Sequence, residues 1–164
     1  MKKLMFILIV FQLISCSGTA QKADKTKEKT YRVSKTKAEW KEVLTSEQFY
    51  ILRQAGTERP FSSPLNKIYK PGTFYCAGCN TPLYESEHKF DSGTGWPSFD
   101  RAIEGSVDKD VDYKLGYARS ELLCSTCGGH LGHVFNDGPR ETTGMRHCIN
   151  GDALVFEPKK TENE

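Results

Sequence analysis

The first apolar pattern along the chain is helical. Between residues 36 and 55, Trp40, Val43 and Leu44 fall on one helical face. A second helix is expected to begin near residues 45–46, where Thr and Ser precede a further group of apolar positions, and Gly56 provides its stop. The pattern therefore predicts two short helices at the start of the folded region.

The rest of the chain has a strand pattern. Its apolar runs are short, rich in β-branched and aromatic residues, and separated by Gly, Pro and Asp. The expected strands are 72–76, 83–84, 111–117, 122–123, 133–135, 147–149 and 153–156. This spacing predicts a mainly β body in one domain, which is what 164 residues normally form.

The N-terminal 15 residues have a different character. Lys2 and Lys3 precede an almost wholly apolar stretch from residue 4 to residue 14, as in a secretory signal, and this stretch is too short to span a bilayer permanently. It ends in Leu-Ile-Ser-Cys16, which resembles the cleavage and lipidation signal of bacterial lipoproteins. We expect a signal peptide over 1–15 and an acylated Cys16; the alternative is ordinary cleavage after Ala20. Either outcome places the mature protein outside the cytoplasm, facing the periplasm or the cell surface if it is anchored.

Charge separates a linker from the folded body. The net charge is +2, yet residues 22–41 carry eight Lys or Arg against three acids. Residues 16–36 have little to bury and are predicted to be the lipidated N-terminus and a flexible tether. With Lys2 and Lys3 also set aside, the remaining residues carry about −5, which argues against a nucleic-acid-binding surface on the folded part. The folded domain is expected over 37–158, with 159–164 as a tail.

Four cysteines form two Cys-x-x-Cys pairs, each beside Gly: Cys76 with Cys79, and Cys124 with Cys127. Two such knuckles can hold one tetrahedral ion, and four thiolates leave no open position for catalysis. The pairs therefore predict one structural zinc ion per chain. Disulfides in an oxidising compartment, or a redox-active pair, are the alternatives.

Cys148 is the candidate nucleophile. On a strand, residues 146, 148 and 150 project from one face, which sets Arg146, Cys148 and Asn150 side by side. Arg146 would lower the thiol pKa, and Asn150 could hydrogen-bond the sulfur or a neighbouring backbone group. A lone cysteine in a β-rich run is otherwise usually a small buried apolar residue.

Two further groups have candidate chemistry. His130 and His133 follow the second knuckle; they are either structural histidines or, because the thiolates already satisfy zinc, imidazoles free for proton transfer. The loop Gly95-Trp-Pro-Ser-Phe99 fixes an aromatic pair, Trp96 and Phe99, as a core plug or as a platform for an apolar ligand group. Sulfur and methyl groups favour aromatic faces.

Taken together, these motifs resemble the methionine-R-sulfoxide reductases, the MsrB family. The resemblance covers about 36–158 and rests on the segments 56–61, 76–79, 95–99, 124–139 and 146–150. It implies a fold of two antiparallel sheets (β-tent-like) with short N-terminal helices and a zinc ion away from the active site. It implies reduction of methionine R-sulfoxide in oxidised proteins.

The resemblance also implies roles for individual residues. Cys148 would attack the sulfoxide sulfur and become a sulfenic acid, while His133, with His130 beside it, would donate a proton to the oxygen. Arg146 and Asn150 would tune and position the thiolate. Trp96 would receive the S-methyl group and so help select the R epimer.

One departure from the family bears on recycling. Many relatives carry a second cysteine in the stretch before Trp96, which here reads Ser-Gly-Thr-Gly over 92–95. We therefore expect an external thioredoxin-like partner or a small thiol to reduce the sulfenic acid. Two other classes compete with this interpretation: a non-catalytic zinc-binding interaction module and a thiol–disulfide oxidoreductase.

Overall fold

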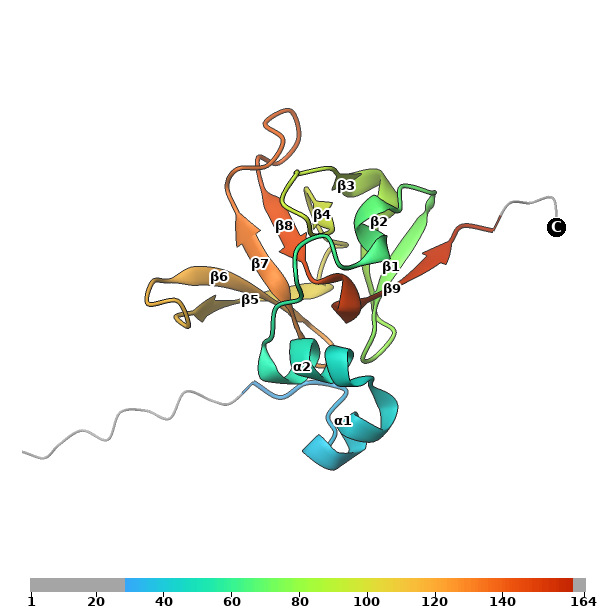
Figure 1. Ribbon diagram of the computed structural model, residues 1–164, viewed down its shortest axis with the longest axis vertical. Helices are drawn as coiled ribbons and strands as arrows, with labels where there is room; N and C mark the ends of the chain where they lie inside the picture. Colours follow the sequence, from blue (N-terminus) through green and yellow to red (C-terminus); the bar gives the residue numbers. More distant parts are fainter. Residues whose placement is uncertain (1–28, 161–164) are drawn as a thin grey trace, which may run out of the picture.

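The structure is a computed structural model and describes residues 29–160. It is mainly β, with two antiparallel sheets and two short helices that lie together at one end of the molecule (Figure 1). The predicted fold class is confirmed. None of the helices among these residues combines the length and apolar character needed to cross a membrane. The predicted signal peptide and Cys16 lie outside the described residues.

Both helices begin where the sequence predicted, because each start is encoded locally. Helix α1 (Lys37–Val43) is capped by Thr36, and helix α2 (Ser46–Gln54) is capped by Thr45. Each threonine hydroxyl accepts from the backbone N–H three residues on, which completes a capping box. The apolar face of the helices packs against the sheets through four buried side chains: Trp40, Phe49, Ile51 and Leu52.

The smaller sheet has the order β2-β1-β9. Its strands are β1 (Gly72–Cys76), β2 (Pro82–Glu85) and β9 (Leu154–Pro158). The larger sheet has the order β3-β4-β8-β7-β6-β5. Its strands are β3 (Lys89–Phe90), β4 (Ser98–Phe99), β5 (Val107–Asp112), β6 (Arg119–Cys124), β7 (His130–Phe135) and β8 (Arg146–Ile149). Three 3₁₀ turns complete the described elements: η1 (Pro64–Lys67), η2 (Ser86–His88) and η3 (Gly151–Ala153).

Aromatic packing joins the two sheets. The ring of Phe99 from β4 stacks on Tyr84 of β2 at 4.3 Å between centroids and meets Phe74 of β1 edge-on at 5.0 Å. All three side chains are fully buried, so the sheets share one core.

The predicted strand over 111–117 is wrong beyond Asp112. Strand β5 ends at Asp112, and residues 113–118 form the turn of the β5–β6 hairpin. The apolar residues that suggested a strand, Tyr113, Leu115 and Tyr117, are exposed at the tip of this hairpin.

The last residues of the predicted tether contact the domain. The Val33 N–H donates to the Thr126 carbonyl at 2.9 Å, and the Val33 side chain packs against the core. Tyr31 covers Gly128, whose φ of +66° and closeness to that ring both require glycine.

Candidate active site and metal centre

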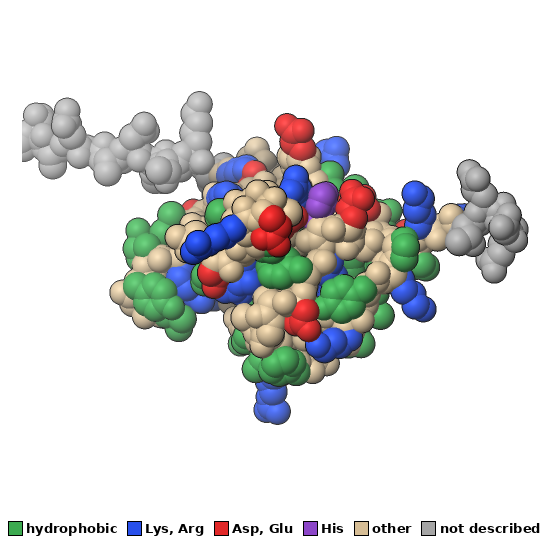
Figure 2. Space-filling model, turned by 90° about the horizontal axis from the view of Figure 1, so that it is seen from above, with side chains coloured by type: hydrophobic (Ala, Val, Ile, Leu, Met, Phe, Trp, Pro, Cys, Tyr) green, Lys and Arg blue, Asp and Glu red, His purple; other side chains and the backbone are tan. Residues whose placement is uncertain are grey.

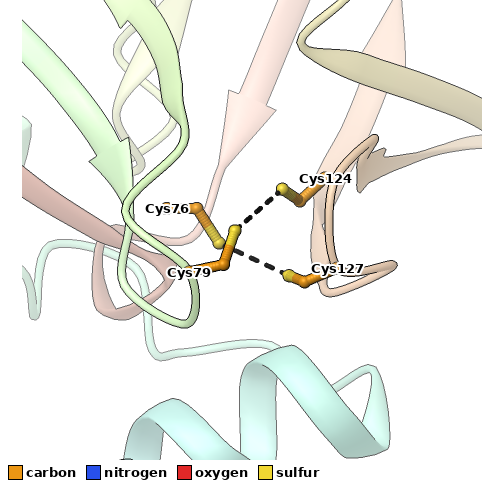
Figure 3. A group of neighbouring side chains, drawn as sticks. All are labelled: Cys76, Cys79, Cys124 and Cys127. Atoms are coloured by element: carbon orange, nitrogen blue, oxygen red, sulfur yellow. Dashed lines mark hydrogen bonds between the residues drawn. The ribbon is translucent and has the colours of Figure 1, made fainter. Parts of the chain in front are cut away.

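The two Cys-x-x-Cys turns face each other across the gap between the sheets. Cys76 and Cys79 lie at the end of β1, and Cys124 and Cys127 lie at the end of β6 (Figure 3). Their four Sγ atoms are all within 4.8 Å of one another, with 3.8 Å between Cys76 and Cys127 and 3.5 Å between Cys79 and Cys124.

This cluster fits a tetrahedral zinc ion. Zn–S bonds of about 2.3 Å place thiolates roughly 3.8 Å apart, close to the separations of Cys76 from Cys127 and of Cys79 from Cys124. Four sulfur donors and no carboxylate are the donor set that zinc favours in structural sites. The four cysteines can therefore bind a metal ion.

Arg53 supports the cluster from helix α2. Its Nη2 donates to Cys127 Sγ at 3.1 Å and its Nη1 to the Cys127 carbonyl at 2.9 Å. The guanidinium also lies 3.7 Å from the ring centroid of Trp40, so the side chain is held in one position. A cation that bonds a ligand sulfur stabilises the thiolate form that binds metal.

The second cluster centres on Cys148. In the antiparallel pairing of β7 with β8, His133 is directly opposite Cys148, and on the other side Ser98 of β4 is opposite Cys148. Residues opposite each other in an antiparallel pair share a face and are neighbours. The sheet thus brings together a thiol and an imidazole that lie fifteen positions apart in the sequence.

Asp112 orients His133. The carboxylate accepts from the Lys114 N–H at 2.7 Å, and together with His133 and Arg119 this holds the pKa of Asp112 well below its usual range. An ionised carboxylate only accepts, so His133 Nε2 carries the proton of its 2.8 Å bond to Asp112. Nδ1 is therefore free of the proton when the ring is neutral. Burial lowers the pKa of His133, and the Asp112 bond opposes that shift.

His130 is held in the same way by a different acid. Its Nδ1 lies 2.5 Å from Glu121 Oε1, and its ring meets that of His133 at 5.3 Å between centroids. His130 is buried, and its Nε2 has no hydrogen-bond partner among the described residues. It packs against the His133 imidazole and is not among the residues that line the pocket over Cys148.

Arg146 lies beside Cys148, but a carboxylate holds it. Its Nε and Nη2 each bond Asp137 at 2.9 Å, and its guanidinium covers the Phe135 ring at 4.5 Å. Burial raises the pKa of Cys148, and the Arg146 charge only reduces this increase. The Arg146 charge thus acts in the expected direction, toward the thiolate, but burial outweighs it.

Asn150 bonds backbone groups. Its Oδ1 accepts from the Glu58 N–H at 3.0 Å, and its Nδ2 donates to the Leu131 carbonyl at 3.0 Å. Of the two partners expected for this amide, the structure shows the backbone. Asn150 thus links β7 to the turn after β8.

Glu58 joins this network at four points. Besides its N–H bond to Asn150, its carbonyl accepts from Trp96 Nε1 at 3.2 Å. Its buried carboxylate accepts from the backbone N–H groups of Gly151 at 2.8 Å and Asp152 at 2.9 Å. Burial raises the pKa of Glu58, and these two bonds oppose the shift.

A pocket of about 130 Å³ opens over Cys148. It is lined by Thr57, Trp96, Arg119, Gly132, His133, Phe135, Cys148 and Asn150. Phe99, predicted to bind substrate, is not there. It is opposite His147, on the other face of the sheet from Cys148, and it is part of the core.

Several site residues have no signal in the sequence. Asp112, Glu121 and Arg119 come from the β5–β6 hairpin, and only its register shows that they meet the histidines. Glu58 lies in a segment that carried the family resemblance, but three of its four bonds join positions more than ninety residues apart.

A protein-family model and curated relatives indicate the same family. The SelR domain family matches residues 44–158. Relatives described as peptide methionine sulfoxide reductase MsrB include those of Leptospira interrogans (52% identity, covering 77% of this chain and 97% of the relative) and Agrobacterium fabrum (50%, 77% and 94%). The Bradyrhizobium diazoefficiens relative is 49% identical over 82% of this chain and 97% of its own length.

Proposed function

The chain belongs to the SelR-domain family of MsrB peptide methionine sulfoxide reductases, and from that premise we propose that it repairs protein-bound methionine R-sulfoxide through a sulfenic acid on Cys148. As a member it is a peptide-methionine (R)-S-oxide reductase. The observation that carries the proposal is the cross-strand pair of Cys148 and His133 in a pocket that Trp96 also lines.

The paired residues hold the proton that the reaction needs. Burial raises the pKa of Cys148 and lowers the pKa of His133, which favours a thiol and a neutral imidazole in the free protein. Moving that proton from the thiol to the imidazole gives a thiolate and an imidazolium without changing the total charge of the pocket. Asp112 stabilises the imidazolium, and Arg146 stabilises the thiolate.

Reduction then transfers one oxygen atom. The thiolate attacks the sulfoxide sulfur and forms an S–S bond as His133 returns the proton to the sulfoxide oxygen. The hydroxyl group then moves to the Cys148 sulfur: the S–S bond and the S–O bond of the substrate break, a new S–O bond forms on Cys148, methionine leaves, and Cys148 becomes a sulfenic acid. The methionine sulfoxide is reduced by two electrons to methionine, and Cys148 is oxidised by two. Trp96 offers the S-methyl group an aromatic face, which favours the epimer whose oxygen points toward His133.

Two external thiols complete the cycle. They reduce the sulfenic acid to the thiol and form one disulfide and one water. Thr94 stands in the stretch before Trp96 where many relatives have a cysteine, so we propose direct reduction by a thioredoxin-like protein or a small thiol. Mass mapping of the oxidised protein tests this: an intramolecular disulfide that includes Cys148 would refute it.

We further propose that the four-cysteine cluster holds structural zinc. Zinc there would supply no reaction step; it would join the turns at the ends of β1 and β6. We expect elemental analysis to find one equivalent of zinc per chain. Substitution of any one of the four cysteines should abolish this zinc binding. Iron or a disulfide in its place would contradict it.

Export and anchoring complete the proposal. Lys2, Lys3, the apolar stretch from residue 4 to residue 14, and Cys16 support a lipoprotein facing the periplasm or the cell surface. Incorporation of labelled palmitate that disappears in Cys16→Ser tests the anchor. Unlabelled but secreted protein would indicate cleavage after Ala20.

The deciding experiment is single-turnover reduction of separate R and S epimers of N-acetylmethionine sulfoxide. Zinc-loaded protein, dithiothreitol and the Cys148→Ser variant are required. We expect turnover of the R epimer only, and none by the variant. Folded, zinc-loaded protein that reduces neither epimer would favour a non-catalytic zinc-binding module.

A further inference from the structure

The pocket is too small for more than one side chain of a polypeptide. Its volume of about 130 Å³ compares with roughly 300–1,000 Å³ for pockets that enclose a whole small ligand. The residues on either side of a methionine sulfoxide must therefore lie on the surface around the pocket opening, and that surface determines which polypeptides bind.

Apolar side chains surround the opening on two sides. On the Arg119 side, the β5–β6 tip exposes Tyr113 (67%), Leu115 (60%) and Tyr117 (59%). Figure 2 shows hydrophobic side chains gathered at the left of the molecule, the side on which this hairpin ends in Figure 1. On the Trp96 side, Phe61 is 64% exposed.

The hairpin tip is fixed beside the pocket. Lys114 Nζ donates to the carbonyls of Gln54 at 3.1 Å and Ala55 at 2.8 Å, two residues before Thr57 of the pocket wall. At the base of the turn, Arg119 bonds Asp112, the residue that orients His133. The apolar tip is thus continuous with the site.

Phe61 occupies its exposed position at a conformational cost. Its φ is +65°, a value that an aromatic residue rarely adopts. Its N–H donates to the Gly95 carbonyl at 2.7 Å, and its ring lies so close to Gly95 that a Cβ there would come within 2.9 Å of it. Burial does not explain this strain, because the ring faces solvent next to Trp96.

We infer that Phe61 and the hairpin-tip residues Tyr113, Leu115 and Tyr117 form a docking surface for an extended polypeptide with apolar residues beside its methionine sulfoxide. The inference rests on the proposed protein substrate. Methionine normally lies in apolar cores, and its oxidation disrupts them. A core segment that becomes exposed in this way carries apolar residues beside its methionine sulfoxide, and these residues match the apolar surface around the pocket.

The test compares three substrates with dithiothreitol as the only reductant, so that docking of a protein reductant plays no part. They are N-acetylmethionine R-sulfoxide, a five-residue peptide with leucine and valine beside the R-sulfoxide, and the same peptide with glycine and serine in their places. The variants are Tyr113→Ser/Leu115→Ser/Tyr117→Ser and Phe61→Gly, which also removes the backbone strain. Val43→Ser/Val155→Ser, at two exposed apolar positions on other elements (56% and 42%), is the matched control.

For the wild-type protein we expect the apolar peptide to have the highest kcat/KM. In the triple variant, the ratio of kcat/KM for the apolar peptide to kcat/KM for the glycine–serine peptide should fall about tenfold, through a higher KM for the apolar peptide. Burial of roughly 60 Å² of apolar surface accounts for a factor of this size. Phe61→Gly should lower the same ratio without lowering Tm. The control variant should keep the ratio of the wild-type protein.

Three results would overturn the inference. The first is an equal loss of kcat/KM on all three substrates, and the second is an equal loss of the peptide ratio in the control variant. The third is concentration-dependent dimers of the wild-type protein that the triple variant abolishes, since the surface would then bind a second copy of the chain. Failure of the wild type to reduce even N-acetylmethionine sulfoxide would instead refute the proposed function itself.

Discussion

Acid should destabilise this domain through one histidine that takes no part in the proposed chemistry. His147 is 7% exposed and lies opposite Phe99 on β4, on the other face of β8 from Cys148. Its Nδ1 is 3.2 Å from the Tyr84 hydroxyl, with which it shares a hydrogen bond. Burial lowers the pKa of His147 to about 4; Lys109 adds to the shift, and Asp100 opposes it.

The magnitude follows from the difference between the folded and unfolded pKa. An ordinary histidine titrates near 6.5, so the unfolded chain takes up a proton at a pH where the folded chain does not. A difference of about 2.5 pKa units at 1.36 kcal/mol each amounts to about 3 kcal/mol. This contribution of neutral His147 to the free energy of unfolding is complete above pH 6.5, decreases as the pH falls, and is lost below about pH 4.

His147→Phe isolates this effect. Phenylalanine keeps an aromatic ring at this position but does not titrate. The Tyr84 hydroxyl then lacks its partner, so Tyr84→Phe/His147→Phe is the matched variant. Urea unfolding of zinc-loaded protein at a series of pH values from 7 to 4 should show the wild type losing about 3 kcal/mol more than the double variant over that range. Parallel curves for the two proteins would refute the reasoning.

Three other changes test the site and its supports. Asp112→Asn removes the charge that stabilises protonated His133, so kcat should fall about tenfold or more and the acidic limb of the pH–rate profile should move to lower pH. Glu58→Gln leaves one of two buried backbone donors unpaired, which should cost about 1–3 kcal/mol of stability and raise KM through Trp96. Arg53→Met should weaken zinc binding about 10–100-fold in a chelator competition, while Arg53→Lys should restore part of the affinity; equal zinc affinity in all three proteins would remove Arg53 from the metal site.

Local signals explain what could be predicted from the sequence. The capping threonines, the Cys-x-x-Cys turns and the alternation of Arg146, Cys148 and Asn150 each depend on residues within a few positions of one another, and the structure reproduces these arrangements. The predicted strand over 111–117 failed because hydrophobicity was taken as burial, whereas these apolar residues are exposed beside the pocket.

Long-range register explains what could not be predicted. His133 meets Cys148 only because the ten-residue connection between β7 and β8 sets their pairing, and no spacing rule fixes a connection of that length. His133 meets Asp112 through two strand pairings, and the one between β6 and β7 shifts at Leu122. Phe99 was predicted to bind substrate because it shares a loop with Trp96. Successive residues of a strand point to opposite faces of the sheet, however, so a shift of one residue places Phe99 in the core and not in the pocket.

The metal cluster and the pocket share no residue, yet one short segment joins them. Arg53 bonds Cys127, and the carbonyls of the next two residues, Gln54 and Ala55, accept from Lys114 of the hairpin. Further along, Thr57 lines the pocket, and Glu58 bonds both Asn150 and Trp96. A shift of Cys127 on metal loss would therefore move the end of α2, and with it the hairpin tip and the support of Trp96. For this reason we expect metal loss to raise KM for peptides before it unfolds the sheets, although no metal ligand faces the substrate.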